Sequence, residues 1–399
     1  MQAWIVKTLG FAILVGSIMA LIDKSGGIDG FVDFMQNRAK VISSAKSALL
    51  LSYMIGVVIF IESSITSLIA GAVGRPFCAR YKIPQAKLAF VCDSTSAPIS
   101  SIIVLNAWGA LLLGLISTQI TQGVIEANAI DLLIDSIFYN FYAMSALAVT
   151  FIAVWFNIDI GPMKHSKYIA VDAKIDLPNP QSMYYMLLPI LLMVFFVFVY
   201  LYITGDGNIL KGSGSSAIFY TVLTTLVFTL FYYVGKKNMT LKTWSKTTVK
   251  GAKNLLPIAA ILLFAFAIGE VTSELGTGQY LASLASENLS IYLTAAVIFL
   301  LSSLISFSTG TSWGTFSIMI PIAVPMAVAM DADVALAIGA VISGGIFGDH
   351  CSPISDTTII SSMASECEVI EHVKTQLPYA LISGLIALLL FLLVAFISN

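Results

Sequence analysis

Four acidic residues lie inside stretches of the sequence that are otherwise apolar. They are Glu62, Asp93, Asp349 and Asp356. A carboxylate inside a membrane is energetically costly, so its presence there usually indicates a cation site or a proton relay. The structural alternative is that each carboxylate caps a half-helix or accepts a hydrogen bond from the backbone. Because matching segments in the two halves of the chain carry these residues, we favour the functional interpretation.

Hydroxyl side chains gather around these carboxylates. The set comprises Ser63, Ser64, Thr66, Ser94, Thr95, Ser308, Thr309, Thr311, Ser312, Ser352, Ser355 and Thr357. Carboxylate, hydroxyl and carbonyl oxygens are the ligands that suit a hard alkali cation. A single Ser or Thr usually bonds to a carbonyl of its own helix, so the clustering is the signal. We predict that Asp93, Asp349 and Asp356 bind Na+, and that these residues and Glu62 also bind H+.

The second half of the chain lacks basic residues around Asp349 and Asp356. No Lys or Arg occurs between Lys253 and Lys374, so no basic side chain there could neutralise a bound anion. A transported cation is the simpler interpretation, although half-helix N-termini and hydroxyls can also hold a carboxylate. His350, beside Asp349, can titrate near neutral pH and carry protons, or it can be an ordinary hydrogen-bonding histidine.

Motifs for catalysis, nucleotide binding or nucleic-acid binding do not occur in the sequence. The three histidines and four cysteines lack the spacing of a zinc site or a disulfide scaffold, and there is no glycine-rich phosphate loop. The sequence therefore predicts no enzyme, no cofactor besides the transported Na+ and H+, and no nucleic-acid partner. A membrane hydrolase would need a nucleophile and a base, such as Ser352 beside His350, and would act on a reporter ester.

Composition places these residues in a lipid bilayer. Hydrophobic residues make up 58% of the 399 residues and charged residues 11%, with a mean hydropathy of +0.93. Such a chain cannot be solvated as a soluble protein. Apolar stretches of about 20 residues, enough for one crossing, occur at 3–22, 183–203, 217–234 and 378–397. We interpret the first as a span and not as a cleaved signal peptide. Backbone polar groups in lipid must be satisfied within each segment, so we predict an all-α polytopic membrane protein.

Two segments combine apolar flanks with a polar centre. They are residues 47–80 and 291–330. An ordinary spanning helix would not expose such a centre to lipid, whereas irregular backbone is tolerated where it lines a wet cavity or is buried in protein. We predict that each segment forms a re-entrant helical hairpin with a polar tip.

A long apolar segment with a proline in a polar cluster follows each hairpin. The first covers residues 87–117 around Pro98, and the second covers residues 334–365 around Pro353. Proline removes a backbone donor and clashes with the preceding turn. We therefore predict that each segment is a broken helix, formed by two half-helices around an unwound middle.

These segments form an internal repeat. Residues 1–156 and 250–399 each carry a span, a hairpin, a broken helix and a closing span, and residues 157–249 form a linker with two spans. Basic residues flank the first hairpin and are missing around the second, so the positive-inside rule places the two hairpin bases on opposite sides of the membrane. The repeats are therefore predicted to be inverted, with eight spans in all.

Two motifs resemble those of a known family. The runs Gly348–Thr358 and Phe307–Thr315 are similar to segments of the NhaC family of Na+/H+ antiporters, within the ion-transporter superfamily. With the spans, the resemblance covers nearly the whole chain. It implies a secondary transporter with a scaffold domain and a mobile transport domain. Such a protein would exchange Na+ for H+ across the cytoplasmic (inner) membrane by alternating access.

A second hypothesis concerns which substrate the protein transports. Relatives in this group include exchangers of organic acids and suspected carriers of amino acids, so the alternative is a Na+- or H+-coupled transporter of such a substrate. An ion channel would need a continuous pore, which inverted broken helices disfavour. A homodimer is compatible with the sequence, because Phe195, Phe196 and Phe198 could face either lipid or a second copy of the chain.

Overall fold

The chain is helical throughout the residues that the computed structural model describes. These are 3–38, 42–60, 63–103, 106–169, 181–207, 212–256 and 290–398, with scattered positions between 259 and 280. Within these ranges there are α-helices and one short 3-10 helix, and no strand. The prediction of an all-helical fold is confirmed. The chain divides into two compact units: unit 1 comprises residues 1–39, 105–114 and 176–264, and unit 2 comprises residues 40–104, 115–175 and 265–399.

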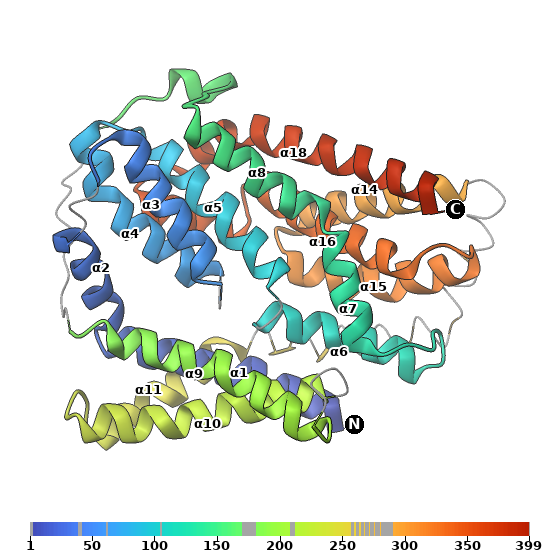
Figure 1. Cartoon of the computed structure of the whole chain (residues 1–399), viewed down its shortest axis with the longest axis horizontal. Helices are drawn as coiled ribbons and strands as arrows, with labels where there is room; N and C mark the ends of the chain where they lie inside the picture. The colour runs from blue at the N-terminus through green and yellow to red at the C-terminus, as the bar shows by residue number, and fades with distance from the viewer. Residues whose placement is uncertain are drawn as a thin grey trace. The chain divides into compact units, whose positions relative to one another are not determined.

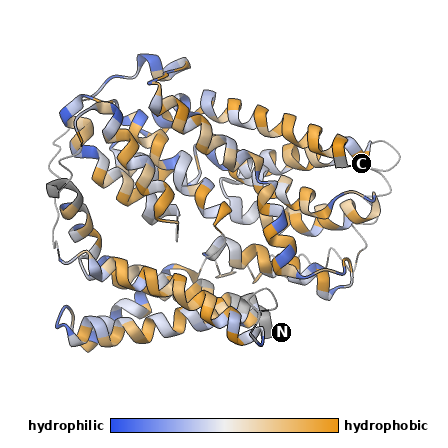
Figure 2. Cartoon of the chain, in the orientation of Figure 1, coloured by the Kyte–Doolittle hydropathy of each residue, from blue (hydrophilic) through white to orange (hydrophobic). Residues whose placement is uncertain are grey.

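Among the described residues of unit 1 there are five complete helices. They are α1 (Ala3–Lys24), α2 (Gly27–Arg38), α9 (Tyr184–Thr204), α10 (Gly214–Gly235) and α11 (Leu241–Asn254). Helices α9 and α10 lie side by side (Figure 1), and the Tyr233 hydroxyl donates to the Tyr185 carbonyl at 2.7 Å. Helix α1 packs against both α10 and α11. Apolar residues run along α9 (Figure 2), and many of them are exposed, as expected for a helix that faces lipid.

Unit 2 contains the segments that carry the acidic residues. Its helices are α3 (Ala45–Val58), α4 (Ser63–Tyr81), α5 (Gln85–Ile102), α7 (Ala129–Phe138), α8 (Phe141–Trp155), η1 (Gly161–His165), α14 (Ile291–Thr309), α15 (Ser312–Ala329), α16 (Val334–Cys351), α17 (Asp356–Ser365) and α18 (Val369–Ser398), and α6 (Ala107–Thr121) belongs partly to each unit. Every residue from Ala86 to Ser101 of α5 is buried, and so is nearly all of α16. These two helices therefore form the interior of unit 2.

Several helices are long and apolar enough to cross a membrane. Among the described residues there are six by length and composition, or seven if α7 and α8, which meet at a 40° bend, form one span. The predicted eight spans include one at the start of the second repeat, before the hairpin at 291–330; residues 257–289 lie mostly outside the described residues. Helices α14 and α15 of the second hairpin, with 19 and 18 residues, are themselves among the six. Helix length alone therefore does not mark this hairpin as re-entrant, and that feature stays a prediction.

The two proline-containing segments differ in where the helix is interrupted. Helix α16 ends at Cys351 and α17 begins at Asp356, so Pro353 lies in the interruption. Helix α5 instead continues through Pro98 as far as Ile102. A proline inside a helix removes only one backbone hydrogen bond, and neighbouring groups can accommodate this loss. The interruption of the first segment thus falls after Ile102 and not at Pro98.

Glycines bring α16 close to α14. A Cβ atom at Gly344 would lie 2.4 Å from the Phe299 carbonyl oxygen, and one at Gly348 would lie 2.2 Å from the Ser303 carbonyl oxygen. The two glycines are four residues apart and form a small-xxx-small seam, which lets helix backbones approach closely in a membrane. Since Asp349 directly follows Gly348, this seam positions the end of α16.

Gly344→Ala is therefore expected to destabilise the protein, although alanine is the better helix former. The added methyl group would collide with backbone atoms, which cannot move aside as a flexible side chain can, at a cost of about 1–3 kcal/mol. Gly235→Ala is the matched control, because a Cβ atom at Gly235 meets nothing within 4 Å. The measurement is the apparent melting temperature in detergent. Equal melting temperatures of the two variants would contradict this account of the seam.

Candidate functional site

Asp349 lies at the end of α16 with its carboxylate buried and only partly bonded. The side chain is 1% exposed. Its Oδ2 accepts a hydrogen bond from the Ser312 hydroxyl at 2.8 Å, whereas Oδ1 has no hydrogen bond of regular geometry within the described part of the chain. A buried carboxylate oxygen without a donor is costly. A cation or a proton bound at Oδ1 would compensate for this cost.

The turn of the second hairpin delivers Ser312 to this carboxylate. Helix α14 ends at Thr309 and is followed by Gly310, whose φ of 66° lies in the left-handed region that favours glycine. Helix α15 then begins at Ser312. A Cβ atom at Gly310 would lie 2.8 Å from the Ile354 carbonyl oxygen, so the turn packs directly against the interruption between α16 and α17. A glycine is thus required for both the turn and the contact.

Asp356 lies on the other side of the interruption, at the first residue of α17. Ser355 caps this helix by accepting from the Thr358 amide at 3.4 Å, and the Asp356 Oδ1 accepts from the Thr357 amide at 2.9 Å. Asp356 is exposed, and it lies close enough to Asp349 for the two charges to repel each other. Two carboxylates therefore flank one unwound segment, an arrangement that binds a cation well.

Asp93, on α5, is fully buried and is held by donors from two other helices. Its Oδ2 accepts from the Gln376 amide at 2.7 Å and from the Thr358 hydroxyl at 3.3 Å, and its Oδ1 accepts from the Ser361 hydroxyl at 3.3 Å. The His372 Nε2 lies 3.8 Å from Oδ2. Both oxygens of Asp93 thus accept hydrogen bonds from the protein, in contrast to the Oδ1 of Asp349.

A buried hydrogen-bond network extends from Asp93. Gln376 bonds to the His350 carbonyl at 3.0 Å and to the His372 Nε2 at 2.9 Å. The Nδ1 of His350 shares a hydrogen bond of 3.0 Å with the Tyr142 hydroxyl on α8, and its Nε2 has no partner within the described residues. Ser361 connects the network to α4 through the Ser67 hydroxyl at 3.1 Å. The network therefore joins α4, α5, α8, α16, α17 and α18 within unit 2.

Most of the other predicted hydroxyls bond within their own helix or hairpin. Thr95 donates to the Val91 carbonyl, Ser308 to Leu304 and Thr309 to Ile305, and Thr66 donates to the Ile59 carbonyl. Ser352 donates to the Phe307 carbonyl, Thr357 pairs with Ser355, and the Thr311 carbonyl accepts from Thr315. Ser63 and Ser94 are buried, whereas Glu62 and the side chain of Ser64 lie outside the described residues. The structure thus brings Ser312 and Ser355 to the aspartates, whereas Thr66, at the start of α4, bonds to the carbonyl of the residue that caps α3.

The residues that hold Asp93 were not predicted from the sequence. They are Thr358, Ser361, His372 and Gln376. The sequence does contain a pattern that could have pointed to His372 and Gln376, because they are four residues apart and so lie on one face of α18. At the start of an apolar helix such a pair is readily interpreted as interfacial.

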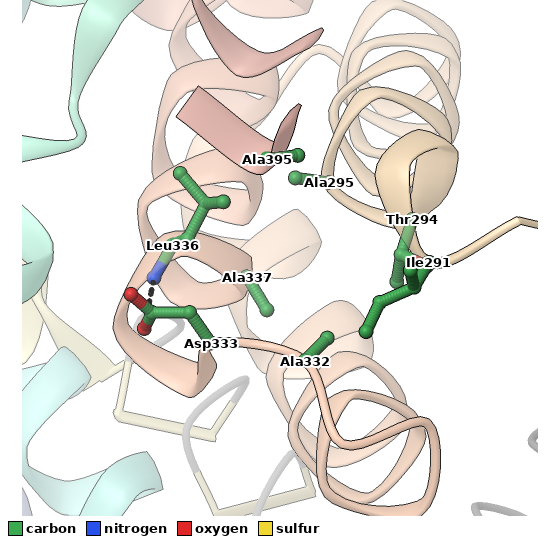
Figure 3. A pocket seen from close by; sticks show the side chains of 8 residues that line it. All are labelled: Ile291, Thr294, Ala295, Ala332, Asp333, Leu336, Ala337 and Ala395. Atoms are coloured by element: carbon green, nitrogen blue, oxygen red, sulfur yellow. Dashed lines mark hydrogen bonds between the residues drawn. The ribbon is translucent and has the colours of Figure 1, made fainter. Parts of the chain in front are cut away.

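A small pocket lies at the other end of α16 and has a different character. It is lined by Ile291, Thr294, Ala295, Ala332, Asp333, Leu336, Ala337 and Ala395 (Figure 3). Its carboxylate, Asp333, caps α16 by accepting from the amides of Ala335 and Leu336 at 2.8 and 3.1 Å. Asp333 and Asp349 are 16 positions apart along the helix, a rise of about 24 Å. This pocket therefore does not belong to the acidic cluster.

Comparison with known proteins identifies the family. Residues 105–396 match the Na+/H+ antiporter family. The chain belongs to this family. It is accordingly a multi-pass membrane transporter and not an enzyme, and Na+ and H+ are the ions that the family exchanges. The matched region contains the whole of α14 to α17, and so it includes Asp349 and Asp356.

Individual relatives agree with this assignment. An uncharacterized protein of Haemophilus influenzae is 33% identical over 390 residues, which cover 93% of this chain and 75% of the relative. The Na+/H+ antiporter NhaC of Alkalihalophilus pseudofirmus is 32% identical over 95 residues, 24% of this chain and 21% of that protein. The predicted resemblance to NhaC is confirmed. The crystal structure of the YdaH transporter of Alcanivorax borkumensis shares the fold, with a TM-score of 0.66 at 15% identity, over 98% of this chain and 87% of that one.

Proposed function

We propose that this protein exchanges Na+ for H+ across the cytoplasmic membrane by alternating access, with Asp349 and Asp356 as the ion-binding carboxylates. The observation that carries the proposal is the buried Asp349, whose Oδ1 has no hydrogen bond of regular geometry among the described residues and which lies near Asp356 across an unwound segment. A buried carboxylate with a second carboxylate beside it is poorly stabilised when both are ionised without a counter-charge. Either Na+ or H+ supplies that charge, and competition between them produces exchange.

Helix α17 links this pair to Asp93. The helix begins at Asp356, and Thr358 and Ser361, within its next turn and a half, donate to Asp93. A movement of α17 at the interruption would change the distance between Asp349 and Asp356 and would also loosen the donors around Asp93. We therefore assign Asp93 to the same exchange cycle, as a carboxylate whose environment depends on the position of α17. The inverted repeats, the mobile transport domain and a homodimer stay predictions.

The proposal is tested with the purified chain in vesicles that have an acidic lumen and Na+ outside. Antiport moves Na+ in and H+ out, so the lumen takes up radioactive sodium and becomes more alkaline. Symport would instead acidify the lumen as Na+ enters. Sodium uptake that begins only when an organic acid or amino acid is supplied would replace exchange of the two ions with coupled transport of that substrate.

A further inference from the structure

Helix α11 carries a stripe of positive charge. The stripe consists of Lys242, Lys246, Lys250 and Lys253, at intervals of four, four and three residues. This spacing places side chains on one face of a helix. All four lysines are exposed, and none has an ion-pair partner among the residues that the structure describes. No acidic residue occurs in the sequence between Asp206 and Glu270, so the charge is not balanced nearby along the chain.

Contacts on the remaining surface of α11 fix its orientation within unit 1. A Cβ atom at Gly251 would lie 2.3 Å from the Gly16 carbonyl oxygen of α1, so the two backbones touch. The Ser17 hydroxyl donates to the Thr248 carbonyl at 2.8 Å, and the Trp244 indole donates to the Thr229 hydroxyl of α10 at 3.3 Å. Because these contacts occupy one side of the helix, the lysine stripe is held facing outward.

Apolar side chains border the lysine stripe on the exposed surface. Leu241 is 60% exposed and Val249 is 51% exposed. A soluble acidic partner would match the charge but would leave these side chains without an apolar contact. The boundary between headgroups and acyl chains matches both, because lysine stems lie along apolar surface while their ammonium groups reach the polar layer. Helix α11 also follows α10, a membrane-length helix, after a connection of only five residues, 236–240.

We propose that the lysine stripe of α11 binds the headgroups of anionic phospholipids and holds α11 at the membrane surface. Clustered lysines next to a membrane helix are attracted to anionic headgroups, and the attraction falls off within a Debye length. The site therefore recognises the phosphate and net charge of the lipid. This inference is independent of the ions that the protein exchanges.

The test compares lipid retention by the full chain in detergent, measured by native mass spectrometry. Wild type is expected to retain phosphatidylglycerol about tenfold or more in preference to phosphatidylcholine, given the strength of lysine–headgroup attraction. Replacing all four stripe lysines with glutamine should make retention of the two lipids nearly equal. The control variant replaces four exposed lysines of unit 2, Lys82, Lys164, Lys167 and Lys374, with glutamine and so has the same net charge. It should keep the preference. A rise in salt from about 0.01 to 1 M should weaken the preference of wild type.

Several outcomes would overturn the proposal. Wild type that retains both lipids equally has no such site, and an equal loss of preference in the control variant would assign the effect to net charge alone. Displacement of phosphatidylglycerol by a soluble polyglutamate at equal charge concentration would favour an acidic protein partner. If the fourfold variant melts at a lower temperature than wild type in lipid-free detergent, the test uses the single variants Lys242→Gln and Lys250→Gln instead. Each should then lower the preference by part of the total, and no change in either would contradict the proposal.

Discussion

Asp349→Asn is expected to reduce sodium-driven proton exchange by roughly a hundredfold or more while the protein stays folded. The substitution keeps the shape of the side chain but removes the charge to which, in our proposal, Na+ and H+ bind in turn. Removing one partner of a buried charge interaction typically costs about 3–5 kcal/mol, and each 1.4 kcal/mol corresponds to about tenfold. The measurement is initial sodium uptake into vesicles with an acidic lumen, read together with lumenal pH.

Two serines of the second hairpin provide a matched pair of controls for this prediction. Ser312 donates to the Asp349 carboxylate, whereas Ser308 donates to the Leu304 carbonyl of its own helix. A hydrogen bond to a charged group contributes about 1.5–3 kcal/mol, so Ser312→Ala should weaken exchange about tenfold. Ser308→Ala should leave exchange close to wild type. If Asp349→Asn exchanged at a wild-type rate, the site would have to lie elsewhere. Equal effects of the two serine variants would show that the hydrogen bond from Ser312 does not contribute to the site.

The position of the acidic cluster was predictable because its signals are local. Carboxylates and prolines are rare in apolar segments, and the run from Gly348 to Thr358 contains two aspartates around Pro353. Proline cannot continue the backbone hydrogen-bond pattern of a helix, so the sequence alone indicates an interruption there. The structure has this interruption between Cys351 and Asp356.

The environment of each aspartate was not predictable, because it depends on contacts that are remote along the chain. Asp93 and Gln376 are 283 residues apart in sequence and 2.7 Å apart in the structure. Asp93 and Asp349 look alike in the sequence, since each lies in an apolar segment followed by serines. Only the packing of α17 and α18 against α5 shows that one carboxylate is satisfied and the other is not. The continuity of α5 across Pro98 has the same origin, because burial of the whole helix overrides a local preference.

Asp93→Leu is expected to destabilise the protein strongly, in contrast to Asp349→Asn. Leucine would leave the Gln376 amide and the hydroxyls of Thr358 and Ser361 without their buried acceptor. At about 1 kcal/mol or more for each unsatisfied donor, the loss should reach about 3 kcal/mol. Asp93→Asn should cost less, because its carbonyl can still accept from Gln376 and a serine hydroxyl can accept from its amide. The measurement is the apparent melting temperature of each variant in the same detergent.

A double substitution separates the hydrogen bonds of Asp93 from its size. Gln376→Leu removes the donor of the shortest of the three bonds, so Asp93→Leu should cost less in that background than in wild type. Residues in direct contact usually show interaction energies of about 0.5–3 kcal/mol. Additive losses would mean that Asp93 does not depend on Gln376.

An Asp93→Asn variant that melts like wild type but no longer exchanges ions would make Asp93 an ion-binding carboxylate of the same kind as Asp349. A variant that both melts early and exchanges slowly would show that the bonds to α17 and α18 position the site, because loosening them would affect folding and transport together.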